Sequence, residues 1–138
     1  IYLEDKDSFI LVSQFRYAVY ETGDDGWINE IVAGVLDDDS PIECAKRECL
    51  EETGYAIQKF KYLGCVFSTP GITSERVHLY IGFCQSSDRI NEGGGVDHEH
   101  EDIKVIEIPR KEAEKMLNDH VFTDMKTVSV LEHFLAHY

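Results

Sequence analysis

The chain has 138 residues, which is enough for one domain with a hydrophobic core of its own. Its formal net charge is −14, from 27 acidic and 13 basic residues, so it is a poor candidate for non-specific binding to nucleic acid or to an anionic membrane. An anionic ligand would need divalent cations between itself and the protein, and the chain has neither an apolar run of membrane-spanning length nor a signal-peptide pattern.

The first third of the chain is predicted to form strands. Residues 9–15 (Phe-Ile-Leu-Val-Ser-Gln-Phe) are typical of a buried strand, and residues 1–3 form a short hairpin strand before it. Residues 17–20 are expected to extend the strand 9–15, and residues 27–32 form a further strand.

Two side chains beside these strands are candidates for ligand binding. Arg16 follows a strand directly, where a cation can contact a phosphate or be an ordinary surface residue. Trp27 can stack on a nucleobase, but a place in the core or in an interface is the favoured interpretation.

A short, well-delimited helix is predicted between Ser40 and Gly54. Ser40 is a good N-cap, Pro41 suits the first helical position, and Glu43 completes a capping box. Gly54 stands where a left-handed residue often ends a helix. The helix between these signals has about three and a half turns.

This helix is predicted to carry its charges on one stripe. Glu48, Glu51 and Glu52 lie at positions i, i+3 and i+4, and converging carboxylates suit Mg²⁺. The alternative is a solvated acidic face on which Arg47 bridges to Glu51 one turn on. The residues expected to pack inward are Ile42, Ala45 and Cys49.

The cysteines indicate a reducing compartment. They form no CxxC pair, and the two on the predicted helix cannot bridge each other. We therefore expect reduced thiols in or near the core of a cytoplasmic protein. These cysteines are Cys44, Cys49, Cys65 and Cys84.

The second half of the chain alternates strands with helices. Strands are predicted at residues 61–67, 77–84 and 103–108, and amphipathic helices at 110–119 and 126–137. This order predicts one α/β layered domain over residues 1–138. The helix residues expected to face the core are Ala113, Met116, Leu117, Val128, Val130, Leu131, Phe134 and Leu135.

The segment from residue 91 to residue 102 joins three glycines, expected to form a hinge, to a densely acidic run. One interpretation is a mobile lid that carries a general base or a metal ligand. Another is a zinc site at His98 and His100, for which no further ligands are placed at suitable spacing. The third interpretation is a solvated acidic loop.

A family resemblance rests on residues 47–55. Their sequence, Arg-Glu-Cys-Leu-Glu-Glu-Thr-Gly-Tyr, matches the Arg-Glu-x-x-Glu-Glu-x-Gly core of the Nudix box, with Gly34 as its opening glycine. Ser40 stands where the box has a glutamate, and the stretch from Gly34 to Arg47 is one residue short. The chain therefore resembles Nudix hydrolases, and Ser-Thr-Pro-Gly-Ile-Thr-Ser-Glu at 68–75 is similar to their nucleoside-diphosphate-sugar branch. Within that branch the chain resembles GDP-mannose pyrophosphatases most, and ADP-ribose pyrophosphatases next.

The resemblance implies an α/β/α sandwich with a mixed β-sheet and a divalent metal centre. The metal is Mg²⁺, with Mn²⁺ as a possible substitute. By this resemblance its ligands are Glu48, Glu52, the backbone carbonyl of Ala33 and Glu101.

The same resemblance implies roles for other residues. Glu99 or Glu51 would be the base, and the choice among Asp97, Glu99 and Glu101 as base or ligand stays open. Arg47 would hold the glutamates in place. The residues implied to bind substrate are Arg16, Gly34, Glu75 and Lys126.

The implied reaction is Mg²⁺-dependent cleavage of the diphosphate of a nucleotide sugar, giving a nucleoside monophosphate and a sugar phosphate. The alternatives are a nucleotide-sensing module without turnover and a Nudix hydrolase of other nucleoside diphosphate derivatives. The relatives form homodimers through an additional N-terminal β-rich segment, which this chain is expected to lack.

Overall fold

The computed structural model describes residues 1–95 and 102–138, and these form a six-stranded mixed sheet. Strands β1 and β5 pair in parallel, and the other strand pairs are antiparallel. The order along the sheet is β3 (Trp27–Glu30), β2 (Ser8–Phe15), β1 (Tyr2–Leu3), β5 (Arg76–Cys84) and β4 (Lys59–Phe67), with β6 (Ile103–Pro109) also paired to β2. The predicted mixed sheet is confirmed.

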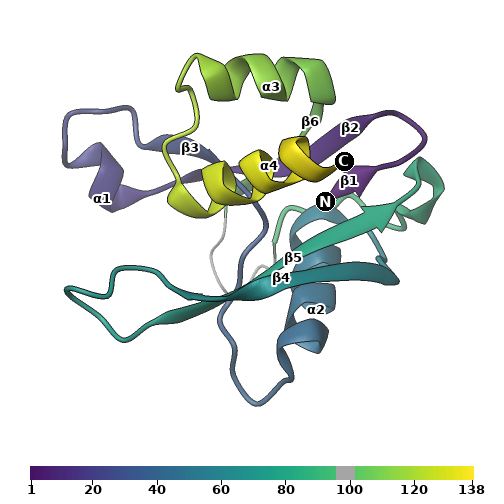
Figure 1. The fold of residues 1–138 in the computed structure, drawn as a ribbon, viewed down its shortest axis with the longest axis horizontal. Coiled ribbons are helices and arrows are strands. Elements are labelled where there is room, and N and C mark those ends of the chain that lie inside the picture. Colours follow the sequence, from purple (N-terminus) through teal and green to yellow (C-terminus); the bar gives the residue numbers. More distant parts are fainter. Residues whose placement is uncertain (96–101) are drawn as a thin grey trace.

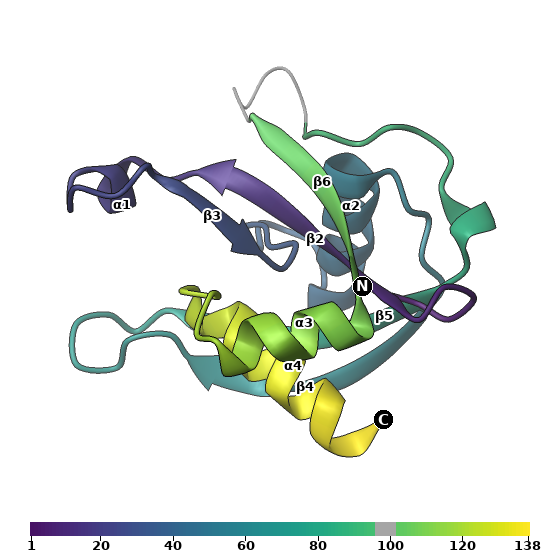
Figure 2. The ribbon, with the colours of Figure 1, turned by 90° about the horizontal axis from the view of Figure 1, so that it is seen from above.

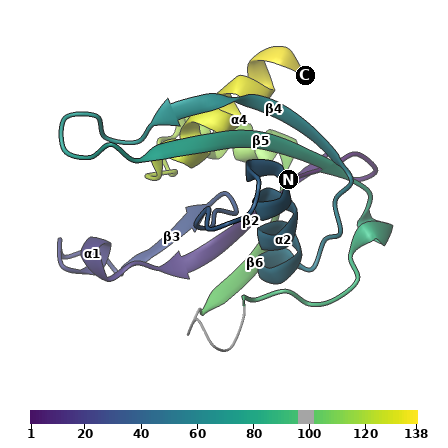
Figure 3. The same cartoon turned by 90° about the horizontal axis from the view of Figure 1, so that it is seen from below.

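Helices cover both faces of this sheet. Figures 1 and 2 show α3 (Arg110–Asn118) and α4 (Met125–His137) together on one side. Helix α2 (Pro41–Thr53) lies on the other side, which Figure 3 shows from below. The predicted α/β/α sandwich is therefore confirmed. No helix of the described residues is both long and apolar enough to cross a membrane.

The core is organised by β2, whose side chains alternate between the two faces. Phe9 and Leu11 pack in the cluster that α3 and α4 cover, whereas Ile10 packs in the cluster that includes Cys49 of α2. The ring centroids of Phe9 and Phe134 lie 4.9 Å apart. The helix residues that were predicted to face the core are all buried or partly buried there.

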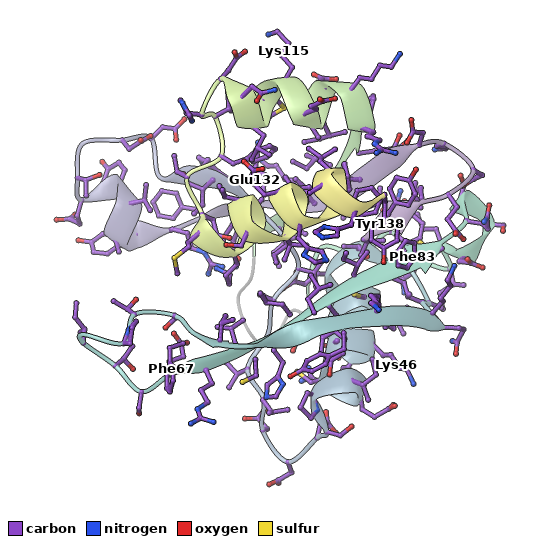
Figure 4. The ribbon with its side chains drawn as sticks, viewed as in Figure 1. Lys46, Phe67, Phe83, Lys115, Glu132 and Tyr138 are labelled. Carbon is purple, nitrogen blue, oxygen red and sulfur yellow. The ribbon has the colours of Figure 1, made fainter. Side chains whose placement is uncertain are left out.

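Aromatic rings continue this core to the C-terminal end of α4. Figure 4 labels Phe83 and Tyr138 there, and their ring centroids lie 5.5 Å apart. The ring of Phe134 stacks on Tyr138 at 4.9 Å. Burying an aromatic side chain of this kind stabilises the fold by about 1.5–3 kcal/mol.

Two local predictions are wrong. Residues 17–20, expected to extend a strand, form the single-turn helix α1 (Tyr17–Tyr20), in which the ring of Tyr20 contacts Phe15 at 5.7 Å. Cys65, expected in or near the core, is exposed because it lies on the edge strand β4. All four cysteines are free thiols, as predicted.

Candidate active site

Helix α2 begins and ends at the predicted residues. The Ser40 hydroxyl accepts a hydrogen bond from the Glu43 N–H at 3.4 Å, and Gly54 has a φ of +78° at the C-cap. The Glu43 carboxylate, which a capping box would direct to the Ser40 N–H, accepts a bond from Lys46 at 2.8 Å. The local signals therefore set the position of the helix along the chain.

The buried face of α2 differs from the prediction. Of the three residues predicted to pack inward, Cys49 is buried as expected, but Ile42 and Ala45 are only partly buried. Glu48 and Glu52, in contrast, are only 9% and 3% exposed. These two glutamates lie one turn apart on the same side of the helix. A buried carboxylate is costly unless other groups compensate its charge, so this face indicates a functional site rather than a solvated acidic surface.

Arg47 provides part of that compensation. Its Nη1 lies 2.8 Å from Glu48 Oε1 and 3.0 Å from Glu51 Oε2, and its Nε lies 3.3 Å from Asp39. Burial alone would lower the pKa of Arg47, but the charge of Glu48 and the bonds to Asp39 and Glu51 raise this pKa above its usual value. The predicted bridge between Arg47 and Glu51 is confirmed, and Arg47 is permanently charged.

Gly34 leaves room for the Glu48 carboxylate. A Cβ atom at residue 34 would lie 1.9 Å from Cδ and Oε1 of Glu48. The absence of a side chain therefore lets this carboxylate lie against the backbone that follows Ala33. This close approach is a physical reason for a glycine at the opening of the box.

These residues border a cleft of about 900 Å³. Its walls are the segment 31–36, the N-terminal half of α2, strand β5 and the first turn of α4. The predicted site residues that line it are Arg16, Ala33, Gly34, Glu48, Glu75 and Lys126. Arg47, Glu51 and Glu52 are not among the described residues that line it.

Two acidic residues near the cleft were missed by the sequence analysis. Glu30, which is 3% exposed, accepts bonds from Arg16 and contacts Lys126 at 3.5 Å. Asp124 lines the cleft and lies 2.6 Å from Lys126. The hydrogen bonds that Arg16 donates to Glu30, more than any other interaction, raise the pKa of Arg16. Glu30 belongs to no local motif, so no sequence signal pointed to it, whereas Asp124 is the N-cap of α4 and could have been found from that local signal.

The three glycines that were expected to form a hinge are tied to the end of α2. The N–H of Gly94 donates to the Glu52 carbonyl at 2.7 Å, and the N–H of Gly95 donates to the Glu51 carbonyl at 3.1 Å. The acidic run that follows, residues 96–101, lies outside the described residues. The predictions for Asp97, His98, Glu99, His100 and Glu101 all fall on this run.

The oxygen donors at this site fit a hard cation. Glu48, Glu52 and the Ala33 carbonyl would each offer an oxygen donor, the type of ligand that Mg²⁺ prefers. Within residues 1–95 and 102–138, no group of three or more His, Cys, Asp or Glu side chains could hold a metal ion. The predicted ligand set takes its third carboxylate, Glu101, from outside these ranges.

Comparison with known proteins shows the family of the chain. The NUDIX domain family matches residues 1–127. Over 134 residues, the chain is 40% identical to the GDP-mannose pyrophosphatase of Cronobacter sakazakii, 42% to that of Pectobacterium atrosepticum and 37% to that of Escherichia coli O1:K1. These alignments cover 96% of this chain and 69%, 68% and 69% of the three relatives.

Proposed function

Because the chain belongs to the NUDIX family, we propose that it is a pyrophosphatase that hydrolyses the diphosphate bond of a nucleoside diphosphate sugar. The relatives named above make a sugar nucleotide of the GDP-mannose type the first substrate to test, with ADP-ribose next. The products would be a nucleoside monophosphate and a sugar phosphate. The observation that carries the proposal is one cleft lined both by Glu48 and by the cations Arg16 and Lys126.

The metal would be Mg²⁺, held by Glu48, Glu52, Glu101 and the Ala33 carbonyl. When bound, it would screen the charge of the diphosphate and lower the pKa of a coordinated water. Hard oxygen donors on a chain of net charge −14 support a cation between protein and substrate.

Side chains of the protein would carry out the proton transfer and hold the carboxylates in position. Glu51 or Glu99 would accept the proton of the attacking water. Arg47, which lies 3.0 Å from Glu51 and 2.8 Å from Glu48, would hold both carboxylates in place.

Substrate would be oriented by other groups that line the cleft. The donors of Arg16 and Lys126 suit phosphate oxygens, and the Glu75 carboxylate, which accepts a bond from the Ser68 hydroxyl, suits sugar hydroxyls. Gly34 would let the diphosphate approach the backbone at the opening of the box.

Turnover of GDP-mannose and ADP-ribose by Glu52→Gln tests the proposal. Phosphate released after phosphatase treatment is measured across a Mg²⁺ titration. We expect Glu52→Gln to lose more than about 100-fold in kcat, the upper range for residues outside the ligand shell. Glu43→Gln removes an exposed carboxylate from the same helix and is the matched control, expected to keep its activity. Full Mg²⁺-dependent turnover by Glu52→Gln would contradict the metal assignment.

The panel also separates the alternatives. Tight binding of a sugar nucleotide by the wild-type protein, without turnover, would indicate a sensing module. Turnover of other nucleoside diphosphate derivatives in preference to sugar nucleotides would indicate a different Nudix substrate.

We also propose that residues 1–138 form one domain of a cytoplasmic homodimer. One sheet with a hydrophobic cluster on each face supports a single domain. Tyr62 and Phe67 of β4 are each 48% exposed, and such apolar surface supports a protein interface. Light scattering at micromolar protein concentration measures the molecular mass. Twice the mass of one chain would support the homodimer, and the mass of a single chain would contradict it.

A further inference from the structure

Glu30 is a buried carboxylate with no part in the reaction described so far. It ends β3, and its carboxylate accepts hydrogen bonds from Nε and Nη2 of Arg16 at 2.6 and 3.1 Å. Lys126 Nζ lies 3.5 Å from its second oxygen. Glu30 is absent from the described lining of the cleft, whereas both cations belong to it, so Glu30 lies behind them.

A second acid fixes Lys126 from the other side. Asp124 Oδ1 lies 2.6 Å from Lys126 Nζ, and its Oδ2 accepts bonds from the N–H and the hydroxyl of Thr127 at the start of α4. The Thr127 hydroxyl in turn accepts a bond from the Ile31 N–H at 2.8 Å, directly after Glu30 in the chain. The end of β3 and the start of α4 are thus joined by a continuous set of hydrogen bonds.

Both cations keep donors for a ligand after these bonds are made. An arginine has five N–H donors and a lysine three, and Arg16 and Lys126 each use two on these carboxylates. The charge of Glu52 also raises the pKa of Arg16. Two cations held in one geometry lose less side-chain entropy when they bind an anion than two free side chains would.

We propose that Glu30 is a positioning residue for substrate binding. It holds the guanidinium of Arg16 and the ammonium of Lys126 on the cleft wall so that both can contact the phosphate oxygens of a nucleoside diphosphate sugar. Asp124 supports Lys126 in the same way. This inference rests on the proposed function, because it assigns those two cations to the same substrate.

Glu30→Gln distinguishes positioning from simple electrostatics, because the two predict opposite signs. If Glu30 only added negative charge near the cleft, its removal would lower the KM for an anionic substrate. If it positions the two cations, Glu30→Gln should raise KM about tenfold with kcat changed less than about threefold, the pattern of lost uniform binding. Glu107→Gln removes an ion-paired glutamate from β6 at the surface and is the matched control, expected to leave KM unchanged.

A double-mutant cycle with Arg16→Lys tests whether Glu30 acts through Arg16. Lysine keeps the charge but lacks the planar fork that binds both Glu30 oxygens. We expect the double variant Arg16→Lys/Glu30→Gln to have a KM within about twofold of the worse single variant, since both changes break one unit. Glu30→Asp keeps the negative charge, so its KM should lie between the values of the wild type and of Glu30→Gln. Fully additive effects would show that Glu30 and Arg16 act independently and would overturn the inference.

Two further measurements keep the test decisive. Circular dichroism checks that Glu30→Gln is folded; if it is not, Asp124→Asn replaces it, because asparagine caps a helix as well as aspartate does while losing the charge beside Lys126. If the wild-type protein turns over no sugar nucleotide, the proposed function fails but the inference can still be tested. The affinity for GDP in the presence of Mg²⁺ is then measured by calorimetric titration. Wild-type protein that binds GDP no more tightly than the variant, or a variant KM at or below the wild-type value, overturns the inference.

Discussion

Gly34→Ala is expected to disable the site while leaving the backbone at residue 34 unstrained. Gly34 does not have a positive φ, so alanine can adopt the same backbone conformation. The new Cβ would nevertheless lie 1.9 Å from the Glu48 carboxylate, where ordinary van der Waals contact begins at 3.4 Å. The carboxylate must therefore move by roughly 1.5 Å, away from the position in which Arg47 holds it.

A displacement of this size sets the expected magnitude. Moving a group in a reacting centre by about 1 Å can cost about 100-fold in rate, so we expect kcat/KM to fall by about that factor. Overpacking a buried site costs about 1–3 kcal/mol, so the free energy of unfolding should fall by a similar amount. A Mg²⁺ titration of turnover with the substrate that the wild type prefers measures the first quantity, and urea unfolding followed by circular dichroism measures the second.

Gly71→Ala is the control for the change of glycine to alanine. A Cβ at residue 71 meets nothing within 4 Å, and this glycine also lacks a positive φ. It should keep wild-type turnover and gain slightly in stability, because alanine restricts the unfolded chain. If Gly34→Ala kept kcat/KM within about threefold of wild type, activity would not depend on the observed position of the Glu48 carboxylate. The reasoning from the close contact between Gly34 and Glu48 would then be wrong.

Three further predictions concern stability and reactivity. Burial alone would raise the pKa of Asp124, but hydrogen bonds from Lys126 and Thr127 hold it below its usual value. Asp124 therefore stabilises the fold above its unfolded-state pKa, and this contribution is lost as the pH falls through the folded-state pKa. The difference in urea midpoint between wild type and Asp124→Asn should accordingly shrink from pH 6.5 to about pH 3, and a constant difference would contradict this. Burial raises the pKa of Cys49 to about 12, whereas Cys65 is exposed. A disulfide reagent at neutral pH should therefore label Cys65 faster than Cys49, and Cys65→Ser should remove the fast phase of labelling. Phe134→Ala should cost about 3–5 kcal/mol of unfolding free energy by urea titration, because the ring is 1% exposed, and a loss below about 1 kcal/mol would show that the core closes around the gap.

The features that sequence analysis predicted depend on neighbours in the chain. Helix α2 is one such feature, because Ser40 and Gly54 act on backbone groups within one turn of themselves. The metal-binding glutamates were proposed for the same reason, since i and i+4 positions share a side of any helix. The α/β layering followed from the order of strands and helices.

The features that it missed depend on residues that are distant in the sequence. Glu30 contacts Arg16 across 14 positions and Lys126 across 96, and neither spacing carries a local signal. The buried side of α2 was misjudged because the prediction assumed that apolar residues, such as Ile42, face inward. Helix α1 has only four residues, and the contact between Phe15 and Tyr20 beside it could not be inferred from β propensity.

The glycine run at 93–95 fixes where the following segment begins. Carbonyl groups at the end of a helix carry partial negative charge, and two of those on α2 are neutralised by N–H groups of Gly94 and Gly95. Strand β6, which starts at Ile103, holds the far side of the segment through its pairing with β2. Because these contacts hold the end of α2 and the start of β6 separately, a change in the length of the chain between them should leave both elements in place. The proposed metal ligands on α2, Glu48 and Glu52, would then keep their positions through such a change.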